Sequence, residues 1–328
     1  MDNQTILAPI DPEIVDRLAA RKQEIDRGSY ASPGIVVALA ISSVPIALAA
    51  LSKDVFAQGT LPAAIKGVLD FALALEIFEN EFYKAVLGRS TSAAQNNAFI
   101  TVRAQAAAVP GAVNTLDQIQ KHETEHVKFL TAAGATNVFN LSATSFDFTG
   151  ARGAGNGPFA KATTNLAFLL QVAQGAEDTG VRAYKGQAAN LMSQPAILEA
   201  ALQIHSVEAR HASRIRRMRR AAAGAPASVR WSGTVRGGGS AAAGGTDLGD
   251  TAAVQAQVAA AFDKIYGPGA NATTAPSEAN VIQGGLNVQT GLSGASFGIE
   301  AAQEAFDEPL DRGDVVAIVQ PFFIPQIQ

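Results

Sequence analysis

The chain contains the pattern Glu-x-x-His twice, in two segments with the apolar periodicity of amphipathic helices. "QIQKHETEH" ends at His126 and "QIHSVEARH" ends at His211, so that the Gln-Ile, the Glu and the last His of the two copies align. On a helix the Glu and the His of each copy share one face with apolar residues, which are Ile119 and Leu130 in the first copy and Ile204 and Ile215 in the second. A carboxylate on such a face is costly unless it is paired or binds a metal. The repeat therefore predicts a helical fold in which both pairs lie in the core.

The stretch "HETEH" in the first copy also fits the H-E-x-x-H pattern of zinc peptidases. On a helix His122 and His126 are roughly 40° apart and Glu123 and His126 roughly 60° apart, so this segment alone allows both a zincin and a Glu-His pair. A zincin needs a third ligand, but Phe129 stands where the extended pattern has glycine, and no His or Glu occurs between His126 and Glu177. The second copy also has a valine in place of His122. We expect Glu-x-x-His to carry the chemistry and His122 to be dispensable for metal binding.

Two further helical segments each place one glutamate on an apolar face. Glu76 lies seven residues before Tyr83, and Glu177 lies seven residues before Tyr184. One Glu from each of two helices and a Glu-x-x-His from each of two others form the dinuclear site of ferritin-like bundles. Four carboxylates and two neutral imidazoles balance two divalent cations, and these donors suit iron or manganese. The expected metal ligands are Glu76, Glu123, His126, Glu177, Glu208 and His211.

Four long segments have helical periodicity, at about 61–87, 92–133, 163–191 and 195–220. Gly88 is a natural end for the first segment, and Pro110-Gly111 should break the second. The connection at 133–163 is long enough to cross a bundle lengthwise, whereas the other two are short. The predicted fold is an all-α core of two helical hairpins joined by a crossover, over residues 61–220.

The first 57 residues have the composition of a leader. Basic residues precede the uncharged, apolar stretch 34–51, which is the order of an export signal, and Val55 and Ala57 could flank a cleavage site. Pro45 interrupts the stretch, so a packing helix is the alternative. We expect export to the periplasm or cell envelope, or membrane attachment through 34–51, with a cytoplasmic location as the alternative.

Residues 221–328 form an irregular extension, rich in Gly and Ser, with short helical candidates near 251–265 and 311–320. Large apolar residues spread along it favour docking on the bundle over disorder. These residues are Trp231, Phe262, Phe297, Phe306, Phe322 and Phe323. Asp311 with Asp314 indicates a helix start.

At these residues the chain resembles the ferritin-like superfamily, and more narrowly the bacterial ferritin-like domain proteins related to plant desiccation-related proteins. The resemblance covers roughly 61–220 and, less specifically, the C-terminal segment. It implies that Glu123 and Glu208 bridge two metal ions, that Glu76 and Glu177 are terminal ligands, and that His126 and His211 each bind one ion. The leader and the extension are absent from iron-storage ferritins, which argues against a 24-subunit cage. The stretches that carry the resemblance are "VLDFALALEIFENEFY", "HETEHVKFL", "AQGAEDTGVRAY", "EARHASRI" and "EAFDEPLDRGDVVAIVQPFF".

The resulting functional hypothesis is a dinuclear iron or manganese protein that reacts with O2 or peroxide, as a ferroxidase, oxidase or catalase-like enzyme, linked to stress or desiccation. The alternative is a structural or interaction protein of the envelope whose metal site is vestigial or only structural. A homo-oligomer is compatible with either. A net charge of -4 gives no attraction to nucleic acid, and the absence of cysteine excludes thiolate sites.

Several polar residues remain open to more than one interpretation. Tyr83 and Tyr184 either donate hydrogen bonds to the ligands or relay radicals, or are ordinary core tyrosines. We expect Glu79, Glu81 and Glu125 to be solvated, with Glu79 as an extra ligand as the alternative. His122 and His205 should lie on the surface or beside the site, with direct metal ligation as the alternative. The run "RIRRMRR" at 214–220 either binds an anion or, as the simpler interpretation, complements the helix macrodipole.

Overall fold

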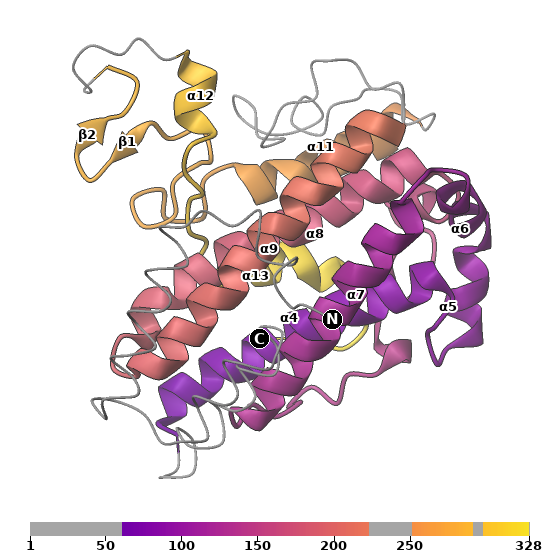
Figure 1. Ribbon diagram of the computed structural model, residues 1–328, viewed down its shortest axis with the longest axis horizontal. Helices are drawn as coiled ribbons and strands as arrows, with labels where there is room; N and C mark the ends of the chain where they lie inside the picture. Colours follow the sequence, from indigo (N-terminus) through magenta and orange to yellow (C-terminus); the bar gives the residue numbers. More distant parts are fainter. Residues whose placement is uncertain (1–60, 223–250, 291–297, 328) are drawn as a thin grey trace, which may run out of the picture. The chain divides into compact units, whose positions relative to one another are not determined.

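The computed structural model describes residues 61–222, 251–290 and 298–327, which belong to one compact unit, Thr60–Gln328 (Figure 1). The expected leader at 1–57, Trp231 and Phe297 lie outside the described residues. In the part of the chain that is described, no helix is long and apolar enough to cross a membrane.

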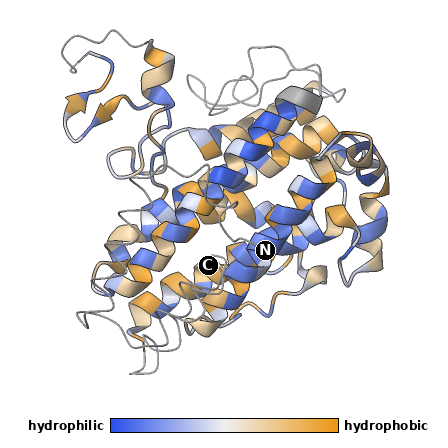
Figure 2. Cartoon of the chain, viewed as in Figure 1, coloured by the Kyte–Doolittle hydropathy of each residue, from blue (hydrophilic) through white to orange (hydrophobic). Residues whose placement is uncertain are grey.

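Four long helices form the bundle: α4 (Ala63–Leu87), α7 (Ala112–Ala132), α8 (Leu166–Gln187) and α9 (Pro195–Ala222). α4 packs against α7 and α8 packs against α9, which gives the two predicted hairpins (Figure 1). Hydrophilic and hydrophobic residues alternate along these helices in Figure 2, as expected for helices with one face in the core. The predicted all-α core of two helical hairpins is confirmed.

The crossover runs along α4. Near its beginning the Thr136 N–H donates to Asp70 Oδ1 at 2.8 Å, close to the first turns of α4. The end of the crossover lies next to Gln105, which follows α4 in the chain. The Gln105 side chain donates to Thr164 O at 2.9 Å and accepts from the Leu166 N–H at 2.7 Å. Between these points the crossover contains the short helices η2 (Ala143–Ser145) and η3 (Ala160–Thr163). The long connection therefore spans the bundle as predicted.

The helix ends follow the local sequence signals. Gly88 ends α4 with φ 75°, and its N–H bonds to the carbonyls of the last turn. Gly111, with φ 77°, begins α7 immediately after Pro110. The segment before Pro110 is two short helices, α5 (Ala93–Ala98) and α6 (Ile100–Ala107), instead of the single predicted one. They meet at Phe99, whose buried ring packs edge-on against Phe82.

The extension carries α11 (Ala252–Tyr266), a hairpin of β1 (Ile282–Gln283) and β2 (Leu286–Asn287), α12 (Ile299–Gln303), α13 (Arg312–Val319) and η5 (Gln320–Phe322). α11 and α13 contact α8. Phe262 and Phe323 are buried, whereas Phe306 is 40% exposed and so is not the anchor we expected. Asp311 precedes α13 as predicted but makes no side-chain cap; its carboxylate accepts from Thr274 instead.

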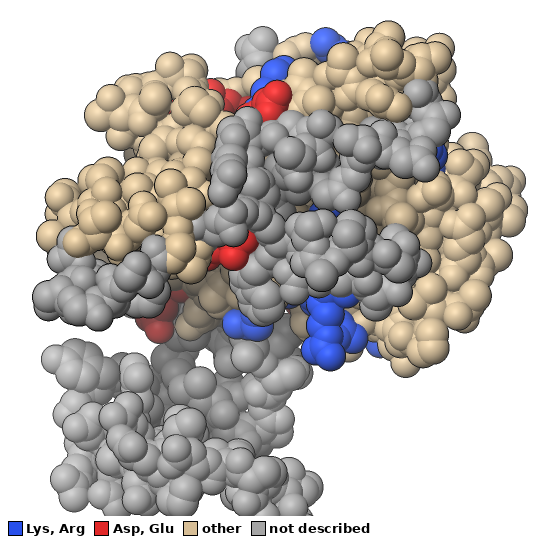
Figure 3. Space-filling model, turned by 90° about the horizontal axis from the view of Figure 1, so that it is seen from above, with Lys and Arg blue, Asp and Glu red and all other residues tan. Residues whose placement is uncertain are grey.

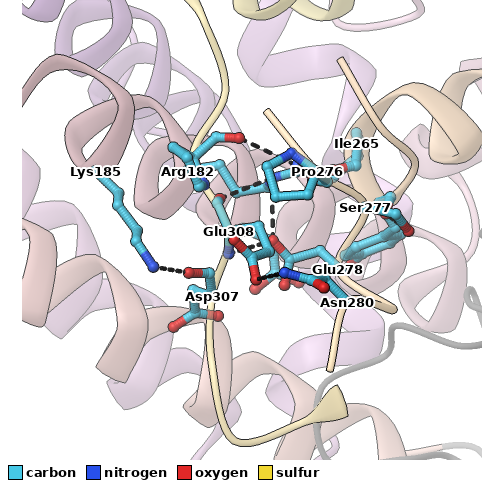
Figure 4. A network of polar contacts seen from close by, with 12 residues as sticks. Arg182, Lys185, Ile265, Pro276, Ser277, Glu278, Asn280, Asp307 and Glu308 are labelled. Atoms are coloured by element: carbon cyan, nitrogen blue, oxygen red, sulfur yellow. Dashed lines mark hydrogen bonds and ion pairs between the residues drawn. The ribbon is translucent and has the colours of Figure 1, made fainter. Parts of the chain in front are cut away.

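Arg182 on α8 joins the extension to the bundle (Figure 4). Its buried guanidinium donates to five backbone carbonyls of the extension and lies 3.0 Å from a carboxylate oxygen of Glu278. The carbonyls belong to Ile265, Gly267, Pro276, Glu308 and Pro309. A single side chain of the bundle thus satisfies polar groups from three separate parts of the extension.

The arginines at the end of α9 make contacts between helices. Buried Arg216 bonds to Asp178 of α8 at 2.7 and 3.0 Å, and Arg219 bonds to Gln174 at 2.5 Å. Both guanidinium groups are buried and bond directly to side chains of α8, as a buried cation requires. On the face seen in Figure 3, the basic and acidic side chains that are drawn in colour lie in small separate groups.

Candidate metal centre

The structure brings the six predicted ligand residues together in the middle of the bundle. α4 supplies Glu76, α7 supplies Glu123 and His126, α8 supplies Glu177, and α9 supplies Glu208 and His211. The four glutamates are 0% exposed, and the two histidines are 4–5% exposed. Such a concentration of buried carboxylates requires compensating charge.

The side chains form two overlapping groups of four, and within each group the ligand atoms lie within 4.8 Å of one another. The first group is Glu76, Glu123, His126 and Glu208, and the second is Glu123, Glu177, Glu208 and His211. Glu123 and Glu208 belong to both groups, while each remaining residue belongs to one. The two halves are related by the sequence repeat.

The shared glutamates each direct one oxygen to each half. His126 Nδ1 lies 3.1 Å from Glu123 Oε2 and from Glu208 Oε1. His211 Nδ1 lies 2.9 Å from Glu123 Oε1 and 3.4 Å from Glu208 Oε2. The unshared carboxylates contact one histidine each, at 3.1 Å for Glu76 and 3.2 Å for Glu177. Glu123 and Glu208 thus face both histidines, whereas Glu76 and Glu177 face one histidine each.

Two buried tyrosines support the terminal carboxylates crosswise. Tyr184 of α8 donates to Glu76 of α4 at 2.5 Å, and Tyr83 of α4 donates to Glu177 of α8. Each tyrosine therefore bonds to the glutamate of the other helix and not to the glutamate seven residues before it on its own helix. Burial raises the pKa of both phenols, and the adjacent carboxylate raises it further, so they remain hydrogen-bond donors at neutral pH.

The electrostatics divide the four glutamates into two kinds. Burial raises the pKa of Glu76 to about 8 and that of Glu177 well above its usual range. Burial acts in the same direction on Glu123 and Glu208, but the two histidines outweigh it and lower the pKa of both carboxyls. Burial alone would lower the pKa of His126 and His211, yet the surrounding carboxylates raise both well above the usual range. The metal-free cluster therefore holds protons at neutral pH.

Hydrogen bonds alone leave several carboxylate oxygens of this cluster without a partner. Whether a metal ion would supply the missing partner tests whether the residues fit a metal. Glu123 Oε1 and both carboxylate oxygens of Glu208 are buried and have no hydrogen-bond partner, although the histidine nitrogens are near them. One imidazole N–H cannot donate to three carboxylates at once. A cation accepts several oxygens simultaneously, and carboxylate with imidazole is a donor set for iron or manganese. The residues therefore fit a metal site.

His122 and His205 belong to neither group. His122 Nδ1 lies 2.8 Å from His211 Nε2, and Gln118 Nε2 lies 2.9 Å from His122 Nε2. His126 has no such histidine partner in the described part of the chain. The two halves of the cluster therefore differ beyond the first layer of contacts, and the second copy of the repeat has a valine at the position of His122.

Glu79 is buried, so the expectation that it is solvated is wrong. Only 4% of this residue is exposed, and burial together with four neighbouring glutamates raises its pKa well above the usual range. It lies one turn after Glu76 on α4, against Gly180 of α8 and close to Glu208. The signal in the sequence was its spacing of three from Glu76. Glu125, by contrast, pairs with Lys128 at 2.7 Å on a partly exposed face.

Residues 66–221 match the family model described as a ferritin-like domain. This range begins inside α4 and ends inside α9, so that it contains the whole cluster. No curated protein and no solved structure matched the chain.

Proposed function

We propose that the chain, whose residues 66–221 match the model of a ferritin-like domain, binds two iron or manganese ions in this cluster and uses them for redox chemistry with O2 or peroxide. The observation that supports this most directly is the sharing of Glu123 and Glu208 between two four-residue groups. Two ions held side by side would supply two one-electron changes to a single O–O bond.

The chain's own residues position the ligands and limit access to them. Tyr83 and Tyr184 hold the terminal glutamates by hydrogen bonds, so that their oxygens are oriented before a metal binds. An imidazole that binds a metal through Nδ1 carries its proton on Nε2, and His211 would then donate to His122 Nδ1. We propose that His122 orients His211 in this way.

The complete absence of exposure at the four glutamates supports redox chemistry over a loosely held surface ion. Buried ligands keep bulk water away from the reacting oxygen atoms. The same burial supports metal ions as part of the folded core, which is the basis of the structural alternative. Activity measurements on metal-loaded protein separate the two functions.

Metal analysis of protein purified without chelator tests the proposal. We expect about two iron or manganese ions per chain. The double variant Glu123→Gln/Glu208→Gln should lose both ions, because each residue contributes to both groups. Glu125→Gln, on the same helix but paired with Lys128, is the matched control and should retain them.

Fewer than one ion per chain in the wild type would reject the proposal, provided that circular dichroism shows folded protein. With two ions bound, oxygen consumption by the Fe(II) form and peroxide breakdown by the Mn form distinguish ferroxidase from catalase-like chemistry. A loaded protein inactive in both assays would support the structural role.

We also propose that the protein is exported to the cell envelope. The support is the order of charge in the first 57 residues, where basic residues precede the uncharged stretch 34–51. Mass spectrometry of the mature N-terminus tests this. A protein that begins after Ala57 in the periplasmic fraction would support export, and an intact Met1 in the cytoplasm would contradict it.

A further inference from the structure

A cavity of about 590 Å³ lies between α7 and α9, beside the His211 half of the cluster. The first turns of α7 and the stretch of α9 from Val207 to Arg214 line it. Arg210 and Arg214 are exposed, whereas His122 is half-buried and His211 is buried. The arginines therefore lie at the mouth of the cavity and the histidines lie deeper.

The lining of this cavity is positively charged. It contains two arginines and no aspartate or glutamate. Neither arginine pairs with a carboxylate in the described part of the chain: Arg210 lies 3.4 Å from Ser206 Oγ, and Arg214 donates to Thr115 Oγ1 at 3.0 and 3.2 Å. Arg216, only two residues further along α9, bonds to Asp178. Among the described residues, the two arginines that line the open cavity thus have no carboxylate partner.

The other polar groups of the lining can donate hydrogen bonds. Asn114 and Gln118 bring amide groups to the same space, and Thr115 brings a hydroxyl group. Two guanidinium groups one helical turn apart offer several N–H donors with the fork geometry that matches phosphate and carboxylate oxygens. The volume is ample for a tetrahedral oxoanion, either free or as the end group of a small metabolite.

We propose that this cavity binds a small phosphate-type oxoanion between Arg210 and Arg214 at its mouth, next to His122 and His211. The buried glutamates below do not oppose this, because protons or metal ions balance their charge. The bound anion would lie on one side of the cluster and would affect the His211 half more than the His126 half. This inference goes beyond the proposed function and does not depend on it.

Calorimetric titration of metal-free protein with inorganic phosphate tests the inference. We expect saturable binding at about one site per chain, which weakens as salt is added because the interaction is between charges. Arg210→Ala/Arg214→Ala should weaken binding by at least about tenfold, the loss expected when charge-assisted hydrogen bonds are removed. Arg217→Ala removes an exposed arginine of α9 that does not line the cavity, and it should change the affinity less than about twofold.

Three results would overturn the inference: no binding by the wild type at millimolar phosphate, equal binding by the double variant, or tighter binding of succinate than of phosphate. Both arginines are exposed, so the double variant should fold, and circular dichroism checks this. Because the titration uses protein without metal, its outcome is independent of metal content. Failure of the metal proposal would leave this result standing, and the reverse also holds.

Discussion

At the scale of single residues, the four glutamates of the cluster are held in two different ways. Glu76 and Glu177 each accept a hydrogen bond from a tyrosine, whereas three of the four oxygens of Glu123 and Glu208 have no hydrogen-bond partner. An unpaired buried carboxylate oxygen costs about 1–3 kcal/mol or more. The folded chain tolerates this cost at the two positions that a pair of cations would share.

Metal binding should release protons and tighten as the pH rises towards 8. Burial raises the pKa of Glu76 to about 8, and neighbouring carboxylates keep the pKa of both histidines high despite their burial. The metal-free cluster therefore holds protons below about pH 8 that each ion must displace. Calorimetry with Mn(II) in two buffers of different ionisation enthalpy, at about pH 6 and about pH 8, measures this release.

The sign of this effect is definite, because protons and metal compete for the same oxygens and nitrogens. Weaker binding at the higher pH, or a binding enthalpy that is independent of the buffer, would contradict it. The Glu123→Gln/Glu208→Gln variant serves as the control, since it should show neither binding nor buffer-dependent heat.

Replacing Tyr184 by phenylalanine should weaken both folding and metal binding. The variant loses the 2.5 Å hydrogen bond to Glu76, and we expect the free energy of unfolding to fall by about 1–2 kcal/mol. Tyr266→Phe is the matched control, because Tyr266 is also a buried phenol and donates to Asp178, outside the cluster. Urea denaturation should show similar losses for both variants, whereas metal titration should show weaker binding only for Tyr184→Phe.

At the scale of the helices, α8 is the element that connects the site to the rest of the fold. One face carries Glu177 and Tyr184 towards the other bundle helices, and the opposite side contacts α11 and α13. Glycines allow this close approach: a Cβ on Gly175 would lie 3.0 Å from Ile265 and from Phe262 of α11. The helix is therefore buried on nearly all sides, unlike a helix at the surface of a bundle.

Two glycine substitutions should change stability in opposite directions. A Cβ on Gly186, at the end of α8, would lie 1.9 Å from the Leu310 carbonyl oxygen, so Gly186→Ala forces the extension away and should cost about 1–3 kcal/mol. Gly67 in α4 has no atom within 4 Å of an added Cβ, and Gly67→Ala should stabilise by about 0.5–1 kcal/mol. Thermal unfolding of both variants measures this, and a stabilising Gly186→Ala would show that the extension does not pack there.

At the scale of the whole described unit, the contacts of Arg182 join several loops of the extension to the bundle. Lys185 adds a bond to Asp307 O near the Arg182 contacts, and Asn280 bonds to Glu308 within the extension (Figure 4). Burial raises the pKa of Glu278 to about 8, in spite of the adjacent Arg182. The loops that bond to this buried cation should loosen together when it is removed.

Arg182→Met should release the extension while the bundle remains folded. The substitution leaves five backbone carbonyls and the Glu278 carboxylate without their partner, which should cost at least about 3 kcal/mol. Hydrogen exchange should rise across 251–327 and remain low in α4 and α7. Arg89→Met removes a half-exposed pair with Asp117 and should change stability by less than about 1 kcal/mol. Unchanged exchange in the Arg182 variant would show that apolar packing alone holds the extension.

The sequence by itself determined the bundle helices, the crossover and the residues that meet in the cluster. Helical periodicity depends only on the order of residues, and a polar side chain inside an apolar stripe is visible in that order. The duplicated Glu-x-x-His and the paired Glu-to-Tyr spacing therefore identified the six clustered side chains before any helix was placed. Gly88 and Pro110-Gly111 marked two helix boundaries for the same local reason.

Only the tertiary structure decided the contacts between helices. Periodicity does not show which neighbour covers a given face, so Glu79 was expected in solvent although α8 buries it. His122 lies next to His211 because α7 and α9 are adjacent, and Arg216 meets Asp178 because α8 and α9 are paired. Arg182 shows the same limit, since its partners are backbone carbonyls, which every residue possesses and no sequence pattern distinguishes.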